Sequence, residues 1–228
     1  MILLSASSIK DYLACSARYK YRTTKSESYI PTKEMAMGTY IHDYISKYKV
    51  GDQMKFIEGN VLPAQYNINM EEKDIERINH CLYSFHYVYS DLVTDKDDVE
   101  KYFRIKLQDG VELVGAMDRV NHSSGSVIDW KTGSTRVKNI DHDIQFMLYN
   151  FAYKKLYGKN PNSVLYVNLL QDTAIRFNYN EMLNKVLFED VIPSMIKNIK
   201  TNNYSKTGMF TGACRNCSFL PTCWKEEE

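Results

Sequence analysis

The feature that most constrains the fold is a change of hydrophobic period in the middle of the chain. From Val99 to Leu107 apolar and polar residues alternate, and Asp109-Gly110 then supplies a turn, a pattern typical of a β-hairpin. A second strand is expected from Val111 to Val120. After the turn-rich segment 121–126, a third strand is expected from Val127 to Lys131. These three strands predict an antiparallel meander.

Segments of helical periodicity lie on both sides of this meander. Three precede it, at 7–21, 35–48 and 71–91, with Ser7 or Ser8 as the cap of the first. The remaining elements follow in the order helix, two strands, helix, at 140–157, 163–170, 174–179 and 181–200. That order predicts an α/β fold, in which a mixed β-sheet core is flanked by helices and contains a strand–helix–strand crossover.

The 228 residues, 44% of them hydrophobic and 25% charged, fit a single domain spanning 1–228. Within it we expect a helical N-terminal part at 1–94, an α/β core at 95–200 and a cysteine-containing C-terminal segment at 201–228. The 29 lysines and arginines nearly balance 28 aspartates and glutamates, so any nucleic-acid binding has to come from local patches. The absence of a long apolar run or a signal peptide predicts a cytoplasmic location without membrane contact.

Two aspartates and a lysine stand at the centre of the meander. If Val120 pairs with Val127, Asp118 lies opposite Asp129, with Cβ atoms roughly 5 Å apart, and Lys131 points to the same side. Two such carboxylates repel unless a cation separates them, and oxygen ligands favour Mg²⁺ or Mn²⁺. An ion there would polarise a phosphate and activate water, while Lys131 orients that water or stabilises the developing charge. The arrangement predicts phosphodiester hydrolysis.

A lone D-x-K pattern is more often a solvated hairpin face, so the surroundings matter. Trp130 indicates that the strand is buried, and Gly115 and Gly133 allow close approach of the backbone. Glu100, at the start of the first strand, either reaches the metal site or faces solvent.

Four segments together resemble the PD-(D/E)XK superfamily, in its RecB-like exonuclease branch. The core motif is similar to Gly115–Val120 (GAMDRV) followed by Ile128–Gly133 (IDWKTG). The upstream G-x-x-x-H motif is similar to Gly38–His42, and the Q-x-x-x-Y motif to Gln145–Tyr149. The resemblance covers roughly residues 3 to 224 and implies the restriction-endonuclease-like fold.

The resemblance also implies roles for particular side chains. It makes His42, Asp118 and Asp129 metal ligands and Lys131 catalytic. Gln145 and Tyr149 are added to the catalytic set, because residues four apart share a helix face, where an amide and a phenol would bond phosphate or the attacking water. Without this resemblance, His42 would be interpreted as a structural helix histidine and Tyr149 as core packing.

Four cysteines form a second predicted site. Cys214, Cys217 and Cys223 are spaced C-x2-C-x5-C, and Cys15 can supply a fourth ligand. The chemistry leaves both zinc and iron–sulfur open, whereas resemblance to CRISPR-associated RecB-like nucleases implies a [4Fe-4S] cluster. Cys81 is expected to be a buried core thiol.

Basic residues interleaved with tyrosines follow Cys15 and suit single-stranded nucleic acid, since bases stack on aromatics while cations meet phosphates. The alternative is a solvated helix end. The residues concerned are Arg18, Tyr19, Lys20, Tyr21, Arg22 and Lys25. Arg136 and Lys138 are expected to hold the scissile backbone, and Arg119 to point to the opposite face of the strand.

The resemblance as a whole implies a metal-dependent DNA exonuclease acting on single-stranded ends. Viral recombination or DNA processing, in a host cytoplasm, and CRISPR adaptation both fit, with protein partners expected in either. A structure-specific endonuclease on the same fold is an alternative. A second alternative is a non-catalytic iron–sulfur DNA-binding adaptor subunit, against which the intact Asp118, Asp129 and Lys131 argue.

Overall fold

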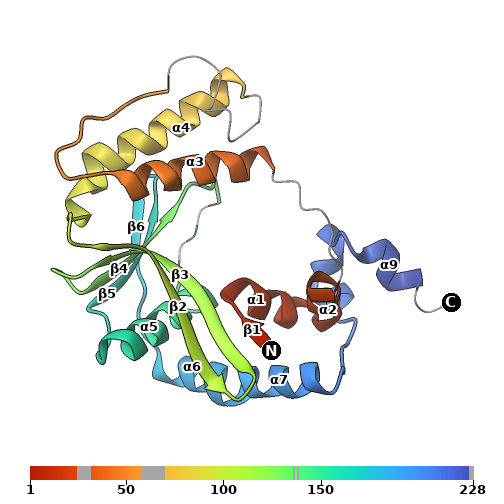
Figure 1. Cartoon of the computed structure of the whole chain (residues 1–228). Helices are drawn as coiled ribbons and strands as arrows, with labels where there is room; N and C mark the ends of the chain where they lie inside the picture. Colours follow the sequence, from red (N-terminus) through yellow and green to blue (C-terminus); the bar gives the residue numbers. More distant parts are fainter. Residues whose placement is uncertain (25–31, 58–69, 136, 138, 226–228) are drawn as a thin grey trace.

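A six-stranded mixed β-sheet forms the centre of the protein in the computed structural model, which describes residues 1–24, 32–57, 70–135, 137 and 139–225 (Figure 1). Its strand order is β1-β3-β4-β5-β6, with β2 paired to β3. The strands are β1 (Ile2–Leu4), β2 (Asp98–Gln108), β3 (Val111–Asn121), β4 (Ser126–Lys131), β5 (Ser163–Asn168) and β6 (Thr173–Arg176). The β2–β3 and β3–β4 pairs are antiparallel and β4–β5 is parallel. The predicted meander and crossover are therefore confirmed.

Helices cover both faces of this sheet, as predicted (Figure 1). In chain order, the helices before β2 are α1 (Ala6–Ala14), α2 (Ser16–Thr24), α3 (Lys33–Lys47) and α4 (Glu72–Ser84), which runs on into η2 (Phe85–Tyr89) and η3 (Ser90–Leu92). The helices after β4 are α5 (Ile144–Tyr157), α6 (Glu181–Lys185), η4 (Val186–Val191), α7 (Ile192–Lys200), α8 (Gly208–Thr211), η5 (Ala213–Asn216) and α9 (Leu220–Lys225). Among the described residues, no helix is both long and apolar enough to cross a membrane.

The first predicted helix differs from the observed one at its start and in its middle. Ser5 caps α1, and Ser8 is its partner in a reciprocal capping box, so the expectation of a cap at Ser7 or Ser8 is wrong. The helix then stops at Cys15, whose backbone is extended at φ −168° and ψ 113°, and α2 starts at Ser16. Cys15 therefore lies at a break between two helices.

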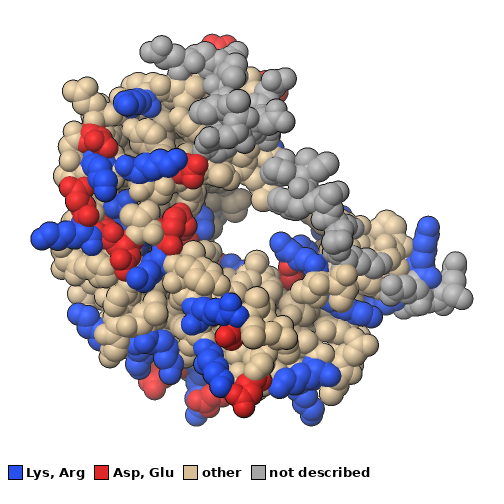
Figure 2. All heavy atoms as spheres, viewed as in Figure 1, with Lys and Arg blue, Asp and Glu red and all other residues tan. Residues whose placement is uncertain are grey.

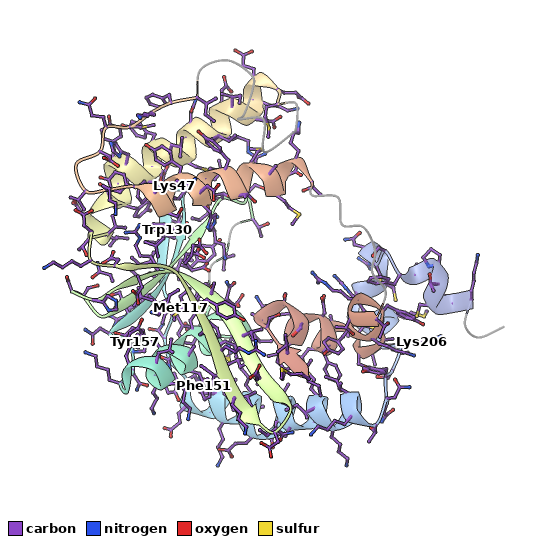
Figure 3. The ribbon with its side chains drawn as sticks, viewed as in Figure 1. Lys47, Met117, Trp130, Phe151, Tyr157 and Lys206 are labelled. Atoms are coloured by element: carbon purple, nitrogen blue, oxygen red, sulfur yellow. The ribbon has the colours of Figure 1, made fainter. Side chains whose placement is uncertain are left out.

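Two hydrophobic cores lie on opposite sides of the sheet. One contains Met117 and the buried face of α5, and the other contains Trp130 and residues of α3 and α4. Figure 3 shows Trp130 toward α3 and Met117 away from it. Because side chains alternate along a strand, Asp129 and Lys131 point to the face opposite Trp130.

Arg119 ties the Trp130 side of the sheet to α3. It is 2% exposed, and its guanidinium donates to the Ile45 carbonyl at 3.2 Å and to the Asp97 carboxylate at 3.3 Å. The prediction of a structural role on the opposite strand face is consistent with these contacts. They fix the C-terminal end of α3 against β3.

Candidate active site

Three acidic residues lie side by side at the centre of the sheet. The β3–β4 register pairs Val120 with Val127, as predicted, and the next step after Arg119–Ile128 brings Asp118 opposite Asp129. On the other edge of β3, Val99 of β2 pairs with Arg119 and Lys101 pairs with Met117. Glu100, between them, therefore lies beside Asp118. Three neighbouring strands thus each contribute one carboxylate.

Asp129 is fully buried and held from two sides. Its Oδ1 accepts hydrogen bonds from Gln145 Nε2 at 3.0 Å and from the Tyr149 hydroxyl at 3.1 Å. Lys131 Nζ lies 2.7 Å from Oδ2. Burial raises the pKa of Asp129, and Lys131 opposes part of that rise. Gln145 and Tyr149 share a helix face, as predicted, and this face holds the Asp129 carboxylate in position.

The charge of Asp118 is poorly compensated. The Trp130 backbone N–H donates to its Oδ2 at 2.8 Å, and His42 Nδ1 lies 3.7 Å from the same oxygen. Burial, and next the charge of Asp129, raise the pKa of Asp118 well above its ordinary value. A buried carboxylate in this position favours a cation beside it.

A group of three residues fits a divalent metal at this point. Ligand atoms of His42, Glu100 and Asp118 all lie within 4.8 Å of one another. Burial, and next the positive charge of Lys131, lower the pKa of His42, which leaves a neutral imidazole with a lone pair for a metal. The group contains His42 and Asp118, two of the three expected ligands, together with Glu100, for which the sequence left two alternatives; the third expected ligand, Asp129, is not part of this group.

Glu100 reaches this group through an unusual backbone conformation. Its φ is +48°, in the left-handed region that non-glycine residues rarely occupy. Such conformations cost about 1–3 kcal/mol and are concentrated at functional sites. The sequence around Glu100 gives no signal for this conformation, whereas its position beside Asp118 follows from the register of the predicted hairpin.

The G-x-x-x-H motif has a steric explanation. A Cβ atom on Gly38 would lie 3.3 Å from Thr132 Oγ1, so the glycine lets α3 pack closely against the chain just after Lys131. His42 is one helical turn further along α3 and therefore reaches Asp118.

The four predicted cysteines line one cavity of about 160 Å³. Cys15 comes from the break between α1 and α2, Cys214 from η5, Cys217 from the residue after η5, and Cys223 from α9. All four are free thiols. Burial raises the pKa of Cys214, and the other three thiols raise it further, as expected where thiolates would repel one another. Cys81 lies elsewhere, 1% exposed, and burial raises its pKa to about 12.

The prediction that tyrosines of α2 are open to stack on bases is wrong. Tyr19 and Tyr21 are 5% and 3% exposed, and Tyr21 packs on Phe219 with ring centroids 6.0 Å apart. Neither ring is open to a base. Arg18 and Arg22 pair with Asp11.

The remaining basic residues of that prediction divide into two groups. Lys20 lies over the rings of Tyr21 and Tyr204. Lys25, Arg136 and Lys138 fall outside the described residues.

Comparison with known proteins agrees with this geometry. The family model described as the PD-(D/E)XK nuclease superfamily matches residues 3–224. The crystal structure of a proposed exonuclease from Eubacterium rectale superposes with a TM-score of 0.62 at 12% identity, over 96% of this chain and 87% of that chain. The crystal structure of SSO0001 superposes with a lower TM-score, 0.43, at 16% identity, over 96% of this chain and 84% of that chain. No curated protein matches the chain. The predicted fold, including its restriction-endonuclease-like class, is confirmed.

The hydrogen bond from Tyr149 to Asp129 gives a prediction. Tyr149→Phe keeps the ring but removes one of the donors to Oδ1, so we expect a 10- to 100-fold loss in manganese affinity or activity, roughly the cost of removing a metal ligand's supporting partner. Tyr153→Phe, on the same helix, is the matched control. Isothermal titration with Mn²⁺ measures the change, and equal affinities for the two variants would contradict the supporting role of Tyr149.

Proposed function

Because the chain belongs to the PD-(D/E)XK nuclease superfamily, we propose that it is a metal-dependent DNA exonuclease of the RecB-like branch. The observation that carries this proposal is the convergence of Asp118, Asp129 and Lys131 on one face of the sheet, with His42 and Glu100 beside them. An idle scaffold gains nothing from burying these carboxylates together, since the arrangement costs stability.

Each residue of this cluster has a distinct part in phosphodiester hydrolysis. His42, Glu100, Asp118 and Asp129 are the proposed ligands of Mg²⁺ or Mn²⁺, which supplies Lewis-acid polarisation of the phosphate when bound. The ammonium group of Lys131, anchored 2.7 Å from Asp129, is placed to stabilise charge on the phosphate oxygens. Gln145 and Tyr149 keep the Asp129 carboxylate in one orientation. We therefore assign them as positioning residues, whereas the sequence placed them on phosphate or water.

Single-stranded DNA ends are the proposed substrate, in viral recombination or DNA processing or in CRISPR adaptation. The resemblance to RecB-like exonucleases supports this, as does the name of the Eubacterium rectale protein. The protein is also hollowed, with an opening between α3 and the helices α1 and α2 (Figures 1 and 2). A structure-specific endonuclease and a non-catalytic adaptor remain the alternatives that the experiment below separates.

We further propose that Cys15, Cys214, Cys217 and Cys223 hold a [4Fe-4S] cluster. These four side chains line one cavity. Four thiolates can hold either a zinc ion or a [4Fe-4S] cluster, and the resemblance to CRISPR-associated RecB-like nucleases favours the cluster. The cluster would join the first helices to the C-terminal segment and stabilise the single domain proposed for 1–228.

The nuclease proposal is tested with Mn²⁺ and end-labelled linear and circular single-stranded DNA. We expect wild-type protein to degrade the linear DNA and leave circles intact. Asp129→Ala should lower cleavage by about a hundred- to a thousandfold, as expected for loss of a group that organises the reacting charges. Asp91→Ala, which removes an exposed aspartate outside the cluster, is the control. Cutting of circles would favour the endonuclease. No cutting of either DNA by protein that retains its cluster would favour the adaptor.

The cluster proposal predicts brown protein, with visible absorbance from thiolate-bound iron and about four iron atoms per chain. Cys217→Ser should lower the iron content and the thermal stability together, because metal binding and folding are linked. Cys81→Ala, at the cysteine that lies in the core, should leave the iron content unchanged. Colourless wild-type protein containing one zinc ion per chain would contradict the proposal.

A further inference from the structure

The sheet contains a gap next to the acidic cluster. One edge of β3 pairs with β2, while the other edge pairs with β1 at 111–113 and with β4 at 119–121. Between these two stretches, the edge of β3 at 114–118 has no paired strand among the described residues. A cavity of about 270 Å³ lies at this gap, with walls from α1, the sheet and α5.

The cavity shares a wall with the catalytic carboxylates. Gln145 and Tyr149 line it, and the same two side chains donate to Asp129 Oδ1. Ala116 also lines it and lies two residues before Asp118, so the two side chains point to the same face of β3. A group held in the cavity is therefore separated from the metal site by a single layer of side chains.

The lining combines apolar and polar surfaces. Phe103, Ala116 and Leu148 supply apolar contact, whereas Gln145 and the Ser7 hydroxyl supply hydrogen-bonding groups. A Cβ atom at Gly115 would lie 2.5 Å from Cζ of Phe103, so the glycine is what allows the ring to lie against β3 at this wall. This combination suits a planar heterocycle, whose faces are apolar and whose edge carries donors and acceptors.

Charge favours a neutral occupant over an anion. Lys10, a cation on this lining, pairs with Asp143 at 2.9 Å. Asp118 and Asp129 lie behind the opposite wall and would repel a phosphate. The cavity, of about 270 Å³, has room for a nucleobase, which is smaller.

We propose that this cavity binds the base of the nucleotide next to the scissile phosphate. The inference rests on the proposed nuclease function and deepens it, because a base held here sets which phosphodiester bond reaches the metal. Stacking and a few adaptable polar contacts tolerate any base, so the site is expected to bind all four bases without sequence preference.

A scan with abasic residues tests this subsite in the wild-type protein. A single abasic residue is placed in turn at each position near the end of a single-stranded oligonucleotide, and kcat/KM is measured in Mn²⁺. We expect a loss of roughly fivefold or more at one position, since stacking of one base is worth at least that much. Ser7→Phe, which fills the cavity from an exposed helix position, should lower kcat/KM on intact DNA and abolish the effect of the abasic residue. Ser123→Phe, the same change in the exposed β3–β4 turn, should behave as wild type.

The outcomes separate this subsite from the nuclease function itself. Methyl 4-nitrophenyl phosphate is a phosphodiester without a base, so its hydrolysis reports the chemistry alone. Wild-type protein that cleaves DNA with a flat abasic profile overturns the subsite and leaves the nuclease function standing. Retention of the position-specific loss by folded Ser7→Phe also overturns it. Wild-type protein that cleaves neither DNA nor this ester overturns both.

Discussion

The structure depends on burying Asp118 and Asp129 next to one another. Asp129 is fully buried, and burial together with the neighbouring charge raises the pKa of Asp118 well above its ordinary value. An acid whose pKa is higher in the folded protein than in the unfolded chain binds its proton more tightly when folded. As the pH rises above the pKa that this carboxyl has in the unfolded chain, the unfolded chain releases the proton before the folded protein does, so the free energy of unfolding falls. The lost stability returns as the pH falls. The fold therefore holds a charge imbalance that a cation would relieve.

The surrounding elements hold these carboxylates in place. Backbone pairing of β3 with β4 sets their separation, and the Trp130 N–H fixes Asp118. From α5, Gln145 and Tyr149 hold Asp129. On the other side, α3 packs closely through Gly38 and presents a neutral imidazole. Helices from opposite faces of the sheet thus meet at one site.

The sequence predicted the parts of the molecule that local patterns determine. The alternation from Val99 to Leu107 and the turn at Asp109-Gly110 gave the hairpin, and the position of Val120 and Val127 around the next turn gave the register that brings Asp118 to Asp129. The helix bearing Gln145 and Tyr149 followed from its periodicity and its stop at Gly158, which adopts the left-handed conformation.

What the sequence missed is decided by tertiary contacts. The three residues of β1 are too short to show a period, and their partner β3 lies about a hundred residues further along the chain. Tyr19 and Tyr21 carry polar hydroxyls next to basic residues, yet the C-terminal segment covers Tyr21. The break at Cys15 turns its thiol toward cysteines some two hundred residues away, and no local pattern encodes that. The left-handed φ of Glu100 likewise has no local cause.

The most direct test of the buried charge imbalance is thermal unfolding at neutral pH of the wild type and of Asp118→Asn, with and without Mn²⁺. Asparagine keeps the shape of the side chain and removes its charge. Without metal, Asp118→Asn should unfold at a higher temperature than wild type, because the repulsion with Asp129 is gone. Mn²⁺ should raise the unfolding temperature of wild type only, since a ligand stabilises the folded state that binds it. A variant less stable than wild type in metal-free buffer, or a wild type that does not respond to Mn²⁺, would contradict this account.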